Sequence, residues 1–176
     1  MSILSKTLKI SLLLAGIIAL GGQQATASST PKLLGTYGNW NAFTFDDEAG
    51  KKVCFMSSKP VSAKGNYTRR GDIYAYITHW PSKGHTNMIN IDTGYSYKAN
   101  SMVDVAVAGQ KFQLATEGEK AWAYNQSDDD RITRAIREGS TMVIKGTSTR
   151  GTLTTDTYSL RGTADAYDAI SKACGI

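Results

Sequence analysis

The chain has 176 residues and a formal net charge of +5, with 41% hydrophobic and 20% charged side chains. This length excludes a chain of several domains, and it is sufficient to bury a hydrophobic core without metal ions as staples. No linker or internal repeat divides the sequence, so we expect a single domain.

The first residues have the pattern of a secretory signal peptide. A basic start precedes an apolar run over residues 10–20, and Ala25–Ala27 matches an AxA cleavage site. The apolar run is too short for an ordinary membrane span. We therefore predict a cleaved signal peptide over residues 1–27 and a mature domain over residues 28–176 that has no transmembrane segment.

The mature part alternates short apolar and polar runs with turn residues, which is typical of an antiparallel all-β domain. Gly50 and Gly109 are expected in tight hairpin turns, where glycine supplies a positive φ. The pattern predicts a β-sandwich or a jelly-roll-like pair of sheets. Nine strands are predicted, over residues 39–45, 52–57, 72–79, 87–92, 102–107, 111–116, 120–124, 141–145 and 152–160.

Two segments carry helix signals instead. In the first, Ser127 is expected to cap a short surface helix that begins with three aspartates and ends at Gly139. In the second, Thr163 is expected to cap a C-terminal helix that ends at Gly175 and buries one apolar face. The aspartates at 128–130 are thus explained by the helix start, because consecutive carboxylates lack the spaced ligands and glycine of a calcium loop.

We find no motif for a metal, a cofactor or a catalytic nucleophile, and we expect none of the three. A zinc site needs three or four ligands, whereas the chain has only His79 and His85 besides its two cysteines. The threonine-rich segment at 145–160 lacks the lysine of a phosphate-binding loop and the glycine pattern of a nucleophile elbow. Its glycines are placed at the turn between the predicted strands at 141–145 and 152–160, so we interpret the segment as a hairpin with Arg150 in its turn.

The two cysteines, Cys54 and Cys174, lie in the part of the chain that we expect to be exported, where an oxidising compartment permits a disulfide. We predict a bond between them, which pins the C-terminal helix to the strand at 52–57. In the chain-entropy model, closing so long a loop restricts the unfolded chain by about 4 to 5 kcal/mol. Two free thiols are the alternative.

Basic residues are concentrated in one part of the chain. Residues 51–98 carry eight basic and two acidic side chains, whereas the rest of the mature part carries ten basic and thirteen acidic ones. If these strands lie together, they form an electropositive face suited to phosphorylated lipid head groups or acidic glycans. An ordinary solvated surface is the alternative. No ordered aromatic ladder accompanies the basic residues, so nucleic acid is not expected as a partner.

Two further features of this region bear on binding. Arg70-Gly71-Asp72 is a tripeptide of host-adhesion ligands, and it is also a turn that starts a strand. Trp40 and Trp122 are predicted inside, whereas Trp80 precedes a proline at a strand end and is predicted as a partly exposed ring for a sugar or an interface. The candidate binding residues are Lys51, Lys52, Lys59, Arg69, Arg70, Trp80 and Arg150.

Several blocks of the sequence resemble the invasion-associated locus B family of exported proteins of Gram-negative bacteria. The blocks are GNWNAF, KVCFM, RRGDIYAYITHWP, TEGEKAW and the segment from GSTMVIKG to AISKACG, in the family's order and with both cysteines in place. The resemblance implies a β-domain that is periplasmic, outer-membrane-associated or secreted, with a link to invasion of host red blood cells. It brings no catalytic mechanism.

We therefore expect a non-enzymatic binding module of the cell envelope. Its partner is expected to be an envelope or host-surface protein, or an anionic lipid or glycan. The alternative is a small periplasmic hydrolase or transferase that uses His79 or His85 as a base near an aspartate. A cluster of histidine, aspartate and serine in a deep pocket would favour that alternative.

Overall fold

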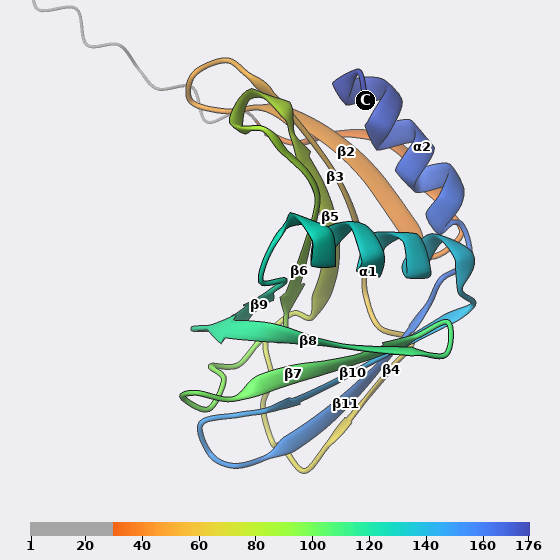
Figure 1. Cartoon of the computed structure of the whole chain (residues 1–176). Coiled ribbons are helices and arrows are strands. Elements are labelled where there is room, and N and C mark those ends of the chain that lie inside the picture. The colour runs from red at the N-terminus through yellow and green to blue at the C-terminus, as the bar shows by residue number, and fades with distance from the viewer. Residues whose placement is uncertain (1–29) are drawn as a thin grey trace, which may run out of the picture.

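The computed structural model describes residues 30–176, so the predicted signal peptide lies outside the described residues. This part of the chain forms eleven strands, two α-helices and one short 3-10 helix, η1 (Figure 1). The strands are β1 (Lys32–Tyr37), β2 (Trp40–Asp46), β3 (Lys52–Ser58), β4 (Ser62–Gly65), β5 (Tyr74–Trp80), β6 (His85–Asp92), β7 (Met102–Val107), β8 (Gln110–Glu117), β9 (Lys120–Trp122), β10 (Thr141–Thr147) and β11 (Leu153–Ser159). The helices are η1 (Pro81–Lys83), α1 (Gln126–Glu138) and α2 (Thr163–Cys174).

All strands belong to one antiparallel sheet with the order β1-β2-β3-β5-β6-β9-β8-β7-β10-β11-β4. The predicted all-β class, the mid-chain helix and the C-terminal helix are confirmed. The expected pair of sheets is instead a single sheet, because the three-residue strand β9 pairs with β6 on one side and with β8 on the other. Strand β4 follows β3 in sequence but pairs with β11 at the far edge of the sheet.

The sheet bends round the two helices, and α1 lies between its two halves (Figure 1). Alternate residues of the strands point to this inner side, as the period of two requires. Met56 of β3 and Ile77 of β5 are fully buried there, and Ile132 of α1 and Ile170 of α2 complete the same core. The core therefore fixes the position of α1 against the sheet, which matters for the site described below.

The sequence placed both helix starts close to their observed positions. Asn125, not Ser127, caps α1, because the Asn125 side chain accepts a hydrogen bond from the N–H of Asp128 at 3.0 Å. Thr163 is the first residue of α2 rather than its cap, and its hydroxyl donates to the carbonyl of Leu160 at 2.9 Å. Gly139 ends α1 as predicted.

One disulfide and one buried ion pair connect distant parts of the chain. Cys54 of β3 and Cys174 at the end of α2 form a disulfide, which confirms the predicted pairing. Arg70, in the loop before β5, donates two hydrogen bonds to the carboxylate of Asp156 in β11, and their side chains are only 3% and 1% exposed. The Arg70 Nε–H also donates to the carbonyl of Thr93 at 2.7 Å. The guanidinium thus has partners that compensate for its burial.

Candidate binding surface

The structure distributes the predicted basic residues over several places. Lys52 begins β3 and Lys59 follows its last residue, so the two lie at opposite ends of that strand. Lys59 forms an exposed ion pair with Asp72 at 3.1 Å, and the hydrogen bond from Lys59 to Asp72 raises the pKa of the lysine. Arg150 lies in the exposed turn between β10 and β11, as predicted.

Arg70 is a correction to the predicted surface. Its guanidinium is buried against Asp156 and lies between the rings of Tyr67 and Tyr95, at 5.3 and 5.0 Å from their centroids. The sequence alone suggested an exposed role for Arg70. Its ion-pair partner lies 86 residues away, so no local pattern indicates that the arginine is buried. The Arg70-Gly71-Asp72 tripeptide therefore does not present its arginine side chain to a partner.

Trp80 is half-buried and belongs to a small polar cluster with the β2–β3 turn. Its Nε1–H donates to the Asp47 carboxylate at 2.9 Å, and Lys83 Nζ lies 4.3 Å from the Trp80 ring centroid. The N–H of Lys51 donates to the same carboxylate at 2.8 Å and lowers the pKa of Asp47. Trp122 is only half-buried, contrary to the prediction, because the alternation of β9 turns Ala121 inward instead.

The two histidines lie apart in the structure. His79 is fully buried, accepts a hydrogen bond from the N–H of Asn87 at Nδ1, and contacts Ser171 Oγ through Nε2 at 3.2 Å. Because Nδ1 accepts, the neutral ring carries its proton on Nε2. Burial lowers the pKa of His79 to about 4. His85, in contrast, is exposed at the start of β6.

The lowered pKa of His79 predicts a pH-dependent stability. The unfolded chain protonates this residue near pH 6.5, whereas the folded protein keeps it neutral down to about pH 4. The unfolded state therefore binds more protons in this window, and the contribution of His79 to the free energy of unfolding should fall by about 3 kcal/mol between pH 6.5 and 4. Burial of Asp129 raises its pKa to about 6, so the Asp129 contribution has the opposite sign over a similar range.

Urea unfolding of the wild type and of His79→Gln at a series of pH values isolates the histidine, because both proteins keep Asp129. The difference in unfolding free energy between the two proteins should decrease as the pH falls through this window. A difference that is the same at pH 7 and at pH 4 would contradict the prediction.

The sheet opens between β6 and β8, beyond the short strand that joins them. β9 pairs with β6 only at Asn90–Asp92 and with β8 only at Ala115–Glu117. The rest of β6 and the first half of β8 consequently have no strand between them. Residues 123–125 and α1 follow β9 directly, and α1 lies in this opening (Figure 1).

On the β6 side, α1 takes the place of the missing strand. The N–H of Ile89 donates to the Asp129 carboxylate at 2.8 Å, and the hydroxyl of Thr133 donates to the Asn87 carbonyl at 3.1 Å. Both partners project from α1, so the backbone edge of β6 is satisfied by helix side chains.

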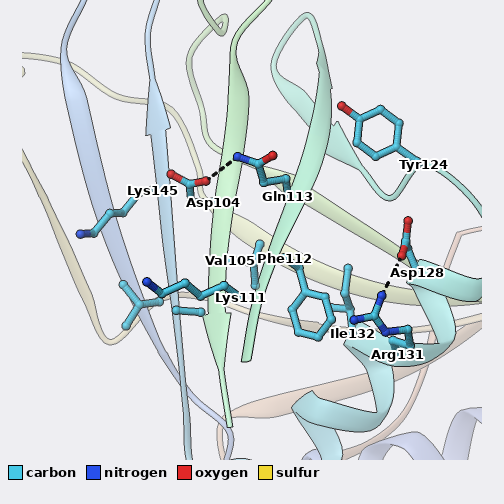
Figure 2. Close-up of a pocket in the computed structure, with 12 residues that line it drawn as sticks. Asp104, Val105, Lys111, Phe112, Gln113, Tyr124, Asp128, Arg131, Ile132 and Lys145 are labelled. Atoms are coloured by element: carbon cyan, nitrogen blue, oxygen red, sulfur yellow. Dashed lines mark hydrogen bonds and ion pairs between the residues drawn. The ribbon is translucent and has the colours of Figure 1, made fainter. Parts of the chain in front are cut away.

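On the β8 side lies a hollow of about 670 Å³, which is lined by residues of β7, β8 and β10, by Tyr124 and by the first half of α1. We call this hollow the β8 groove; its volume lies in the usual range of binding pockets, about 300–1,000 Å³. Figure 2 shows Tyr124 and Arg131 on one side of β8, with Asp104 and Lys145 on the other. The groove is lined by Asp104, Val105, Ala106, Lys111, Phe112, Gln113, Tyr124, Asp128, Arg131, Ile132, Val143 and Lys145.

The β8 groove combines an apolar floor with a charged rim. Phe112 and Ile132 are buried in the floor, and the Arg131 guanidinium lies 5.3 Å from the Phe112 ring centroid. Tyr124 stands at the rim with 60% of its surface exposed. The Gln113 amide donates to Asp104 at 3.1 Å on the outer face of the sheet (Figure 2). Such a mixture suits a partner with both apolar and polar groups.

None of these groove residues was among the predicted binding residues. In sequence they read as an ordinary hairpin and an ordinary helix start, because nothing local shows that β9 stops after three residues. The feature that marks the groove is the missing strand beside the first half of β8. It can be recognised only from the order of the strands in the folded sheet.

Comparisons with known proteins agree on the family and the fold. A family model described as "Invasion associated locus B (IalB) protein" matches residues 40–171. A solved structure described as invasion associated protein B from Bartonella henselae is similar, with a TM-score of 0.56 and 16% sequence identity. The match covers 84% of this chain and 100% of that chain. The curated proteins give no match.

Proposed function

Because the chain belongs to the invasion associated locus B family, we propose that it is an exported, non-enzymatic binding domain of the bacterial cell envelope. In this proposal the protein is periplasmic, outer-membrane-associated or secreted, and its partner is an envelope or host-surface protein. The name of the family and of the similar structure links such proteins to invasion. The disulfide supports export, because such bonds persist in oxidising compartments.

The observation that carries the binding role is the β8 groove. It combines an apolar floor, an exposed tyrosine and charged side chains at a place where the sheet is incomplete. Over residues 30–176, neither helix has the length and apolar character that crossing a membrane requires. The fully buried His79 is a poor general base, since a base must reach a proton of the substrate.

Site-specific photo-crosslinking tests the proposal. A photoreactive amino acid is placed at Gln113 in the β8 groove, and in a matched control at Asp165 on the exposed side of α2. Each oxidised protein is mixed with intact cell envelopes, and in a second series with host-cell membranes. We expect one defined product from position 113, identified by mass spectrometry, and none from position 165.

A third protein with the photoreactive group at Lys52 tests the predicted basic residues separately. A product from position 52 alone would move the binding surface to the β2–β3 hairpin. Equal products from all three positions, or no product from any, would contradict a specific binding role.

A further inference from the structure

We infer that the β8 groove binds an extended peptide segment of the partner, which joins the sheet as an added strand beside β8. The inference rests on the proposed function and names the chemical form of the partner. Strand addition at a sheet edge is a common mode of peptide recognition, with main-chain hydrogen bonds for affinity and alternate side chains for specificity.

The register of the β7–β8 hairpin shows which backbone groups face the groove. Ala108 and Gly109 both have positive φ, 49° and 73°, so a two-residue type I′ turn joins Val107 to Gln110. The residues that flank such a turn are hydrogen-bonded to each other, and the pattern alternates along an antiparallel pair. Lys111 and Gln113 therefore direct their N–H and C=O groups away from β7, towards the groove.

The neighbouring strand confirms this alternation. Ala115 is the next residue of β8 that points away from β7, and it is paired with Trp122 of β9. β9 pairs with β8 only from Ala115 to Glu117, so it does not extend beside Lys111 and Gln113. Within residues 30–176, no group hydrogen-bonds to the main chain of Lys111 or Gln113 on the groove side. Two donors and two acceptors are thus available to an added strand.

The two sides of the opening differ in a way that points to β8. The edge of β6 is satisfied by Asp129 and Thr133 of α1, as described above. The edge of β8 faces a hollow instead. Beside it, the Arg131 guanidinium lies 5.3 Å from the Phe112 ring centroid and the Tyr124 hydroxyl donates to Met102 Sδ at 2.9 Å, and neither contact uses the main chain of Lys111 or Gln113 (Figure 2). A folded protein usually covers, bends or shortens an exposed strand edge, because a straight one pairs with other chains. In this protein one side is covered and the other is left open.

The two outermost strands of the sheet, β1 and β4, carry features that hinder pairing with another chain. β1 has a register irregularity between Leu33 and Gly35, and β4 has only four residues, one of them Lys64. The pairing of β8 with β7 is regular from Gln110 to Ala115. The open half of β8 is therefore the better template for an added strand.

The side chains beside this edge indicate the preferred sequence of the segment. Lys111 points to the outer face, and neither it nor Lys145 has an ion-pair partner within residues 30–176. Opposite charges directly across two strands stabilise the pair, so an acidic residue is favoured opposite Lys111. Phe112 points inward to Ile132, so an apolar residue is favoured opposite Phe112. The ligand is thus an extended segment that alternates apolar and acidic residues.

A displayed library of random heptapeptides, selected on the oxidised wild-type protein, is the probe for this mode. The decisive pair of variants is Gln113→Pro and Gln113→Ala. Both remove the side chain, but only proline removes the N–H that faces the groove, and no ladder bond to β7 is lost. We expect the selected peptides to bind Gln113→Ala like the wild type and to bind Gln113→Pro about tenfold more weakly.

Two further measurements locate and characterise the bound peptide. Hydrogen exchange at the amides of Lys111 and Gln113 should slow when the peptide is added, whereas the β1 amides should not change. Lys111→Glu should weaken binding of the acidic peptides about fivefold. Circular dichroism and thermal unfolding of each variant confirm that it remains folded.

Three results would overturn strand addition. These are failure to enrich any peptide, equal binding by Gln113→Pro and Gln113→Ala, and protection of β1 or β4 amides instead of β8. A dimer that forms in the wild type but not in Gln113→Pro would make a second copy of this chain the occupant, which also overturns the inference. If crosslinking from position 113 succeeds while these tests fail, the binding function stands and only the mode of recognition is wrong.

Discussion

Replacing both Cys54 and Cys174 with alanine is expected to lower the free energy of unfolding by about 4 kcal/mol. The disulfide closes a loop with a sequence separation of 120 residues, and cross-links over loops of this size restrict the unfolded chain most. The bond also holds the last turn of α2 against β3, so its loss should release that end of the helix first.

Urea unfolding of three samples measures this effect: the oxidised wild type, the wild type with a reductant, and the double alanine variant. The last two should unfold at similar, lower urea concentrations, and the reductant should not change the variant. Hydrogen exchange should show faster exchange in the last turn of α2. An oxidised wild type no more stable than the variant would show that native strain offsets the entropy effect.

The second large effect is expected from the buried ion pair of Arg70 and Asp156. Arg70→Met leaves the Asp156 carboxylate uncompensated in a site where its side chain is 1% exposed. Removing one partner of a buried pair typically destabilises a protein by about 3–5 kcal/mol, because an isolated charge remains in the interior. The loss should appear in urea unfolding at neutral pH.

Two matched variants test whether the uncompensated charge is the cause. Arg70→Met combined with Asp156→Leu removes both charges and should recover most of the lost stability. Lys59→Met breaks the exposed pair with Asp72, in which the two side chains are 58% and 78% exposed. This variant should change the free energy of unfolding far less than Arg70→Met does, because solvent screens an exposed pair. If the double variant is no more stable than Arg70→Met, lost packing rather than lost charge pairing explains the effect.

Much of the fold was accessible from the sequence because its signals are local. The alternation of apolar residues predicted nine strands, and the positive φ of Gly50 and Gly109 confirms two predicted turns. β1 was missed because Gly35 interrupts its pattern, and β4 because four residues carry too little alternation. The disulfide was predictable since the chain offers only two cysteines for pairing.

The binding surface was less accessible because its features depend on contacts between distant segments. Arg70 and Lys59 are both basic residues near turns, yet one is buried with Asp156 and the other is exposed with Asp72. Their difference depends on where β11 lies. The β8 groove likewise exists because β9 is short, which no pattern within β8 or α1 encodes.

The position of β4 has a consequence for the order in which the chain folds. β3 and β4 are adjacent in sequence, but β4 pairs with β11, which is synthesised much later. A chain that emerges N-terminus first can form its early hairpins locally, whereas β4 stays unpaired until β11 arrives. The buried ion pair of Arg70 also depends on β11, because its partner Asp156 lies in that strand. Closure of β11 on β4 therefore joins residues of high sequence separation and is expected to limit the folding rate.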